Sequence, residues 1–308
     1  MFLAKDFIET AENLIFAVVA DGLEQGKVLC FLRYVRKNGQ TKKCDTAAAN
    51  QLLQQYYPHY LHYSPVLDAT LHAVPLALIV KHHQPKQRLQ HILNTQQPDD
   101  IERDLIALCR LLQTHGVDLT QCGVTGSLLI GVQQFSSDMD LVCYERSVFQ
   151  QCRTVMANLI EQNQVQALNQ QDWQDAYQRR DCELSLPTYI WHEQRKLNKG
   201  MMNGRKFDLS LINLNHSPPI HYQKCGKITL QTTVINDTAA FDYPAEFEID
   251  YPDIASVVSF TATYTGQAVT GERIEVSGRI EQNAHGVKRI VVGSSREAIG
   301  EYIKVLPC

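Results

Sequence analysis

TGSLLIGVQQFSSDMDLV, residues 125–142, is the stretch of this sequence that decides its fold and its chemistry. Asp138 and Asp140 lie on a predicted strand, where alternate residues share a face, so both carboxylates point one way while Met139 and Leu141 point into the core. Two like charges this close repel each other unless a cation lies between them. Because Mg²⁺ prefers hard oxygen ligands together with substrate phosphates, we expect the pair to hold Mg²⁺, or Mn²⁺, on a triphosphate.

Gly126 and Ser127 precede the acidic pair and follow a short predicted strand at 122–125. Glycine lets a phosphate approach the backbone closely, and serine adds a hydroxyl donor beside exposed backbone amides. These two residues are therefore the predicted nucleotide-binding element. The alternative for the whole stretch is a surface turn and a strand with two solvated aspartates.

This spacing of Gly-Ser and Asp-hydrophobic-Asp resembles the motif of the DNA polymerase β superfamily of nucleotidyltransferases. The whole chain also resembles a largely archaeal group of predicted nucleotidyltransferases, through FAVVA and VLCFLRYV (16–20 and 28–35), HAVP (72–75) and GERIEVSGRI (271–280). The resemblance implies an α+β fold whose central mixed sheet is flanked by helices. It implies a reaction class and leaves the acceptor open.

The superfamily uses a third carboxylate from a neighbouring strand, and Asp208 in KFDLSLI is the best candidate. It alternates with Phe207 and Leu209, so it is expected to face away from the core. Glu183 and Asp181 are weaker candidates. The resemblance implies that Asp138, Asp140 and Asp208 are catalytic metal ligands in a two-metal transfer from a nucleoside triphosphate such as ATP, with release of pyrophosphate.

This chain departs from the superfamily in the positively charged residues that would bind the triphosphate. Polymerase-like members often place basic residues directly after Gly-Ser, where this chain has Leu128-Leu129-Ile130. The basic stretch 195–206 leads directly into Asp208, and within it Lys199 and Arg205 are the predicted nucleotide contacts. The alternative for this stretch is a solvated basic helix end.

The predicted elements divide the chain into three segments. Residues 1–96 read as a mixed α/β domain with a hairpin formed by 14–19 and 28–32 and a helix at 46–56. Residues 97–216 form the transferase core, with helices at 98–115, 146–161 and 186–199 and strands at 122–125, 138–144 and 207–211. Residues 217–308, after Pro218-Pro219, alternate with period two at 228–234 and 258–264 and continue with strands at 273–277 and 289–292 joined through 283–286. This last segment predicts a small OB-like β-barrel.

Composition limits the function classes. The 308 residues carry a net charge of −4, which excludes bulk binding of nucleic acid. Residues 217–308 hold eight Lys and Arg against eleven Asp and Glu, so a structural or partner-docking barrel is favoured over a nucleic-acid-binding one. His82, His83 and His91 lack acidic or cysteine partners at ligand spacing, so a solvated helix face is preferred to a metal site.

Nine cysteines without a C-x-x-C pair predict reduced thiols in a cytosolic protein. The N-terminus has no signal-peptide pattern and no apolar run spans a bilayer, so we expect a cytoplasmic protein without a membrane partner.

Three functions remain open at the sequence level. The first is transfer of a nucleoside monophosphate to an RNA end, a protein hydroxyl or a small molecule. The second is a catalytically silent transferase fold that binds nucleic acid or regulates a partner. The third is kinase-like phosphotransfer to a small molecule, which would release a nucleoside diphosphate instead of pyrophosphate.

Overall fold

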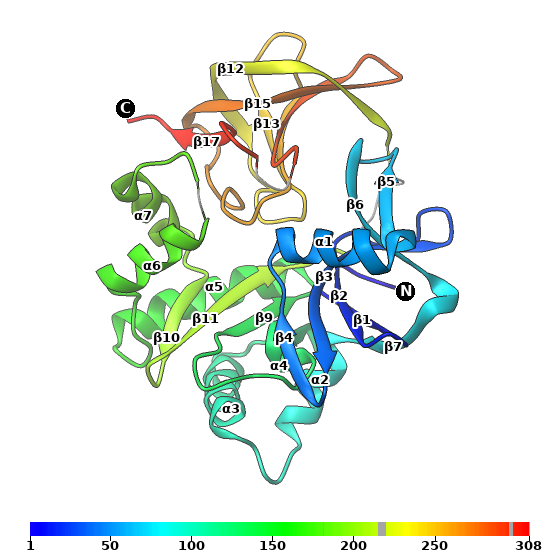
Figure 1. The fold of residues 1–308 in the computed structure, drawn as a ribbon. Coiled ribbons are helices and arrows are strands. Elements are labelled where there is room, and N and C mark those ends of the chain that lie inside the picture. The colour runs from blue at the N-terminus through cyan, green and yellow to red at the C-terminus, as the bar shows by residue number, and fades with distance from the viewer. Residues whose placement is uncertain (181, 215–219, 296–297, 308) are drawn as a thin grey trace. The chain divides into compact units, whose positions relative to one another are not determined.

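The computed structural model describes residues 1–180, 182–214, 220–295 and 298–307 (Figure 1). These residues form helices and three β-sheets, which confirms the expected α+β class. The predicted boundary at Pro218-Pro219 and the candidate Asp181 lie outside the described residues.

The first sheet has seven strands, all drawn from the N-terminal segment, and their order is β5-β6-β3-β2-β1-β7 with β4 paired to β3. The β2–β3 hairpin was predicted and is confirmed, with Phe16 opposite Leu32. Helix α1 (Thr46–Tyr56) packs its buried Ala49 and Leu53 into the core of this sheet, and Asp45 caps its first turn. The strands are β1 (Phe7–Thr10), β2 (Leu14–Val18), β3 (Lys27–Lys37), β4 (Gln40–Lys43), β5 (Leu61–Ser64), β6 (Ala69–Pro75) and β7 (Ile79–His83), with 3₁₀ turns η1 (Pro58–Tyr60) and η2 (Leu76–Leu78).

The second sheet is mixed, with the order β10-β11-β9-β8. β9 and β11 run parallel, while β8 and β9 run antiparallel. Its strands are β8 (Cys122–Thr125), β9 (Met139–Cys143), β10 (Lys199–Met202) and β11 (Arg205–Leu211). The sheet therefore has the mixed strand directions expected of the predicted core.

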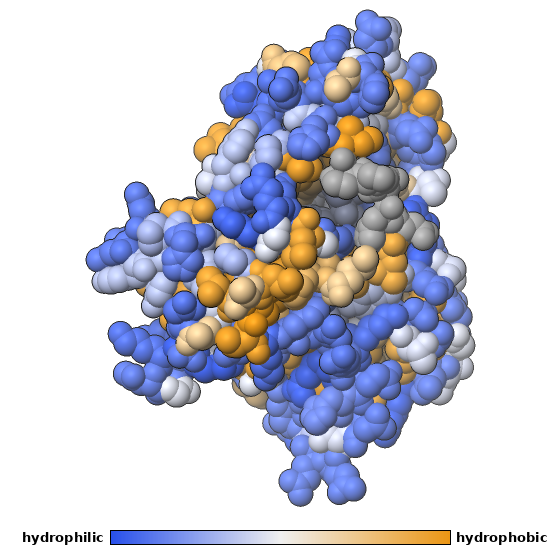
Figure 2. All heavy atoms as spheres, turned by 90° about the vertical axis from the view of Figure 1, so that its right-hand side faces the viewer, coloured by the Kyte–Doolittle hydropathy of each residue, from blue (hydrophilic) through white to orange (hydrophobic). Residues whose placement is uncertain are grey.

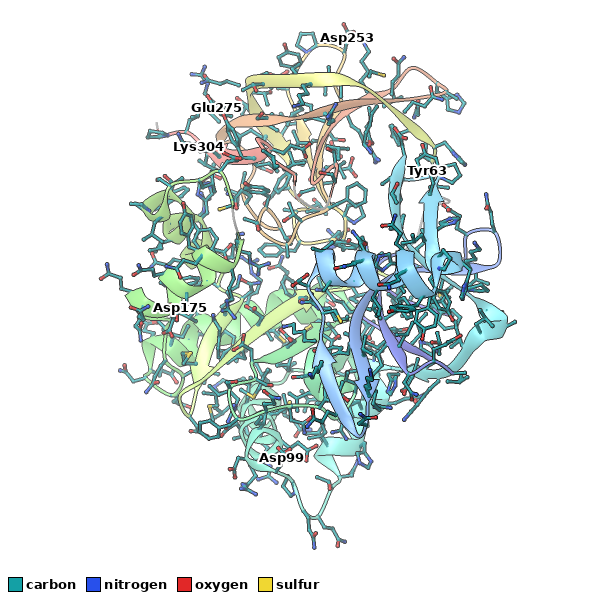
Figure 3. The ribbon with its side chains drawn as sticks, in the orientation of Figure 1. Tyr63, Asp99, Asp175, Asp253, Glu275 and Lys304 are labelled. Carbon is teal, nitrogen blue, oxygen red and sulfur yellow. The ribbon has the colours of Figure 1, made fainter. Side chains whose placement is uncertain are left out.

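Four helices accompany the second sheet: α2 (Pro85–Leu93), α3 (Asp100–Thr114), α4 (Gly126–Leu129) and α5 (Arg146–Glu161), with the 3₁₀ turn η3 (Leu119–Gln121) before β8. α3 begins at a capping box, in which Asp99 and Glu102 each bond the other's backbone N–H. Asp99 is labelled in Figure 3 at the start of this helix. The predicted bounds of α5 are confirmed.

The third sheet contains β12 (Tyr222–Asn236), β13 (Ala245–Ile249), β14 (Ser256–Ser259), β15 (Arg273–Asn283), β16 (Lys288–Val292) and β17 (Tyr302–Val305). Pairing runs from β12 through β13, β14 and β16 to β15, which pairs back with β12 and also with β17. The barrel itself, and its OB-like character, stay predictions. The predicted strand at 258–264 is wrong beyond Ser259, because the chain leaves the sheet there and buries Tyr264, whose hydroxyl donates to the Glu301 carbonyl.

The chain divides into two compact units. The first comprises 1–64, 69–152 and 201–212, and the second comprises 65–68, 153–200 and 213–308, which includes helices α6 (Gln170–Arg180) and α7 (Leu186–Arg195). Each sheet falls within one of the three predicted segments, while the first unit holds the first sheet together with most of the second. The three-domain division stays a prediction.

The surface of the first unit carries exposed apolar side chains at the edge strand β7. Figure 2 shows apolar atoms among hydrophilic ones on the side of the molecule at the right of Figure 1, where β7 lies. Leu76, Leu78 and Val80 are the large exposed hydrophobic residues of η2 and β7. In the part of the chain that the structure describes, every helix is too short or too polar to cross a bilayer.

Candidate metal and nucleotide site

The second sheet places Asp140 and Asp208 side by side. β9 and β11 pair in parallel with Asp208 directly opposite Asp140, and residues that are directly opposite in a sheet point to the same face. Along β11, Phe207 and Leu209 are buried while Asp208 is only partly buried, so the aspartate faces away from the core as predicted. Strand pairing thus joins carboxylates that lie 68 positions apart in the sequence.

Gly126 lies directly against the Asp140 carboxylate. Its φ of +68° is in the left-handed region, and a Cβ atom built on it would stand 2.3 Å from Asp140 Oδ2. Both observations require glycine, because any other residue would be strained and would collide with the carboxylate. Ser127 follows in the short helix α4 and is partly buried. The Gly-Ser turn and the acid pair, predicted to act together, are therefore adjacent.

Asp138 directly precedes β9, and its charge acts on Asp140 as that of Asp208 does, although the oxygens of the three carboxylates do not all lie within 4.8 Å of one another. Burial raises the pKa of Asp140 to about 6, and the negative charges of Asp208 and Asp138 act in the same direction. The positive charges of Lys5 and Lys43 oppose this shift. A carboxylate whose charge is disfavoured by two acidic neighbours is a good ligand for a divalent cation, which removes the repulsion. Carboxylate oxygens are the kind of donor that Mg²⁺ or Mn²⁺ takes, so these acids are the candidates for holding such an ion.

The first sheet contributes the cationic part of this site, which sequence reasoning missed. Lys5 precedes β1, and its carbonyl accepts a hydrogen bond of 2.7 Å from Thr125 Oγ1, next to Gly126. Lys43 ends β4 and lies opposite Tyr34. Burial is the larger cause of the raised pKa of the Tyr34 phenol, and the negative charge of Asp140 raises that pKa further. Neither lysine belongs to a motif, and both are far from residues 125–142 in the sequence, so only the packing of β1, β3 and β4 reveals them.

The two predicted basic contacts have other partners in the structure. Arg205 is buried; its Nε donates to Asp104 at 3.0 Å and its Nη1 donates to the carbonyls of Phe135 and Ser137. It thereby holds the loop that leads to Asp138. Lys199 belongs to the second unit and donates to Glu193 at 2.6 Å. The predicted nucleotide contacts of both residues stay predictions, and the proposal below does not use them.

The remaining candidates from the sequence are engaged elsewhere. Glu183, in the second unit, accepts a hydrogen bond from the Gly300 backbone N–H. His82 and His83 lie on strand β7, so the expected helix face is wrong for them. His82 bonds Asp6 at 2.7 Å and His83 bonds Glu9 at 3.2 Å, because β1 pairs with β7. His91 lies on α2 as expected.

Comparison with known proteins gives one informative match. The chain is 32% identical to the "Uncharacterized protein MJ1086" of Methanocaldococcus jannaschii, and the alignment covers 98% of each protein. No family model matches the chain. No solved structure matches it. The identity extends over both compact units, and the chain belongs to the same family as this archaeal protein.

Proposed function

We propose that this protein is a Mg²⁺-dependent nucleotidyltransferase that moves a nucleoside monophosphate from a nucleoside triphosphate to an acceptor hydroxyl. The observation that carries the proposal is the register of β9 and β11, which sets Asp208 beside Asp140 while Gly126 lies against the Asp140 carboxylate. A surface turn with solvated aspartates does not account for a left-handed glycine packed against a partly buried acid whose pKa is raised.

Each residue has a role that follows from its chemistry. Asp138 and Asp140 would hold the divalent ions, and Asp208 would join them and help to take the proton from the acceptor hydroxyl. The bound ions would supply charge neutralisation at the triphosphate. The acceptor oxygen forms a bond to the α-phosphorus while the bond from that phosphorus to the bridging oxygen breaks, so pyrophosphate leaves.

The triphosphate needs more positive charge than metal ions alone provide, and Lys5 and Lys43 are basic residues whose charges act on Asp140. Ser127 and the backbone of the Gly-Ser turn would bind phosphate oxygens. The first sheet is therefore part of the nucleotide site in this proposal.

The test follows label from each of the four α-³²P nucleoside triphosphates with Mg²⁺ into total RNA, protein extract or small molecules. We expect pyrophosphate release and transfer of label, and a reduction of about 100- to 1000-fold in Asp140→Asn. Asp100→Asn, an exposed acid on α3, is the matched control and should retain activity.

Three results would contradict the proposal. Transfer that survives the double change Asp138→Ala and Asp140→Ala would remove the metal site from the chemistry. Release of a nucleoside diphosphate would indicate kinase chemistry. Calorimetry that detects RNA binding indifferent to Mg²⁺ and nucleotide, in a protein without turnover, would indicate a silent binding module.

A further inference from the structure

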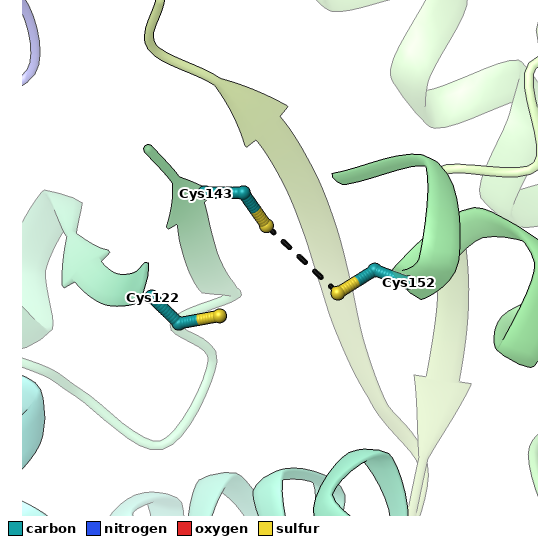
Figure 4. A group of neighbouring side chains, drawn as sticks. All are labelled: Cys122, Cys143 and Cys152. Atoms are coloured by element: carbon teal, nitrogen blue, oxygen red, sulfur yellow. Dashed lines mark hydrogen bonds between the residues drawn. The ribbon is translucent and has the colours of Figure 1, made fainter. Parts of the chain in front are cut away.

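A second cluster of metal-ligating side chains lies at the opposite end of β8 and β9 from the acidic site. The sulfur atoms of Cys122, Cys143 and Cys152 all lie within 4.8 Å of one another, and those of Cys143 and Cys152 are 3.9 Å apart (Figure 4). Cys122 begins β8, Cys143 ends β9 directly opposite it, and Cys152 comes from α5. Three thiols from three elements thus converge on one point.

The separation of the sulfurs matches metal ligation and not a disulfide. A tetrahedral zinc ion with bonds of about 2.3 Å to sulfur places its ligand sulfurs about 3.8 Å apart. A disulfide would require about 2.05 Å between the two sulfurs. At 3.9 Å, Cys143 and Cys152 are close to the zinc-ligand separation.

A fourth thiol, on α3, lies near this group, although its sulfur is not among those within 4.8 Å of one another. Cys109 is fully buried, and its thiol interacts electrostatically with those of Cys122 and Cys152. All four side chains are at most 1% exposed, so a bound ion would have protein ligands only and no open position for water. Four sulfur ligands in a closed, buried site are the donor set of structural zinc.

We propose that Cys122, Cys143 and Cys152, with Cys109 as the fourth ligand, bind one structural zinc ion. The ion ties β8 and β9 to α3 and α5 at the end of the strands remote from Gly126 and Asp140. It therefore sets the geometry of the second sheet without touching the acidic site. This inference does not depend on the proposed nucleotidyltransferase activity.

The first test measures zinc in the full-length protein, purified under reducing conditions without chelator, by plasma mass spectrometry. We expect about one zinc per chain in the unchanged protein and in Cys30→Ser, which alters an equally buried thiol in the first sheet. Cys122→Ser and Cys143→Ser should lose most of the zinc. The proposal would be overturned if either variant kept as much zinc as the unchanged protein, or if the unchanged protein contained no zinc.

A second measurement protects the test against variants that fail to fold. The unchanged protein, freed of zinc and reduced, is titrated with Co²⁺, and we expect thiolate-to-cobalt charge-transfer bands and the strong visible bands of tetrahedral cobalt. Cys109→Ser should weaken the charge-transfer band by about a quarter, because one of four thiolates is lost. No tetrahedral cobalt spectrum, or an intact mass showing that Cys143 and Cys152 form a disulfide, would overturn the site.

Discussion

Two acids in this chain, the partly buried Asp140 and the buried Glu193, have opposite environments. Burial alone would raise the pKa of Glu193, but the ammonium groups of Lys196 and Lys199 hold it at about 2. Asp140 has acidic neighbours, and burial together with Asp208 and Asp138 raises its pKa to about 6. The negative charge of Glu193 is balanced by two neighbouring ammonium groups, whereas that of Asp140 is disfavoured by two acidic neighbours and opposed only in part by Lys5 and Lys43.

The difference separates a structural cluster from the site that we propose to bind a cation. Lys196 is fully buried, and its Nζ also donates to the Thr263 carbonyl at 2.7 Å, so its hydrogen bonds tie α7 to the loop after β14. The Lys196 ammonium, held by these hydrogen bonds, stabilises the folded arrangement of the second unit. The acidic site of the first unit instead stores repulsion that a ligand can relieve.

The largest expected effect comes from breaking the compensated cluster. Glu193→Gln leaves the buried ammonium of Lys196 without its counter-charge, so the free energy of unfolding should fall by about 3–5 kcal/mol. Urea denaturation followed by circular dichroism measures the loss. Asp175→Asn, an exposed acid on α6 (Figure 3), is the control and should change stability little. A loss below about 1 kcal/mol for Glu193→Gln would show that the cluster is not structural.

The next largest expected effect is the stabilisation of the protein by bound Mg²⁺, which concerns only the acidic site. Mg²⁺ at about 100 times its dissociation constant should stabilise the protein by about 2.7 kcal/mol, because the ion binds the folded site and not the unfolded chain. Thermal melts with and without Mg²⁺ measure this shift. Asp140→Asn should lose it, whereas Glu193→Gln should keep it. An equal shift in Asp140→Asn would place the ion elsewhere.

The pH dependence of stability has the sign opposite to that of an ordinary salt-bridged acid. Since the pKa of Asp140 is about 6 in the folded protein and 3.8 in a model compound, folding is disfavoured as pH rises through this interval. In chelator at about pH 8, Asp140→Asn should therefore be more stable than the unchanged protein, by up to about 3 kcal/mol. At about pH 4 the difference should largely vanish. A stabilisation that is constant across this range would contradict the electrostatic origin.

The smallest effect concerns Lys43, which acts on Asp140 by its charge. Lys43→Ala should raise KM for the triphosphate about fivefold, which corresponds to about 1 kcal/mol, and less at high salt because the side chain is exposed. Lys42→Ala removes the neighbouring exposed lysine of β4 and is the control. If both variants weaken binding equally, the effect is one of general surface charge and not of the site.

Several elements could be predicted from sequence because their signals are local. α3 shows a capping box and an apolar stripe, and the bounds of α5 follow from its periodicity. Helix α6 was missed because only Trp173 and Ala176 of its eleven residues are buried, which leaves almost no periodic signal. β1 and β7 were missed as well, since both are short, and the histidines of β7 suggested a solvated helix face.

The residues of the candidate site also divide into those that local sequence signals could predict and those that they could not. Asp138, Asp140, Gly126 and Ser127 are close in sequence, and alternation along one strand placed the acids. Lys5, Lys43 and the three clustered cysteines have no common spacing, because they come from separate parts of the chain. No motif could have joined them.

The amino-acid sequence by itself determined the α+β class, the bounds of α1 and α5 and the association of the Gly-Ser turn with Asp140, because these depend on periodicity and spacing within about 20 residues, whereas the predicted helix 186–199 was wrong beyond Arg195. Only the tertiary structure decided that Asp208 stands opposite Asp140, that Lys5 and Lys43 act on Asp140, and that three distant thiols meet. The physical reason is that strand register and sheet packing depend on the whole core, which no local stretch of sequence encodes.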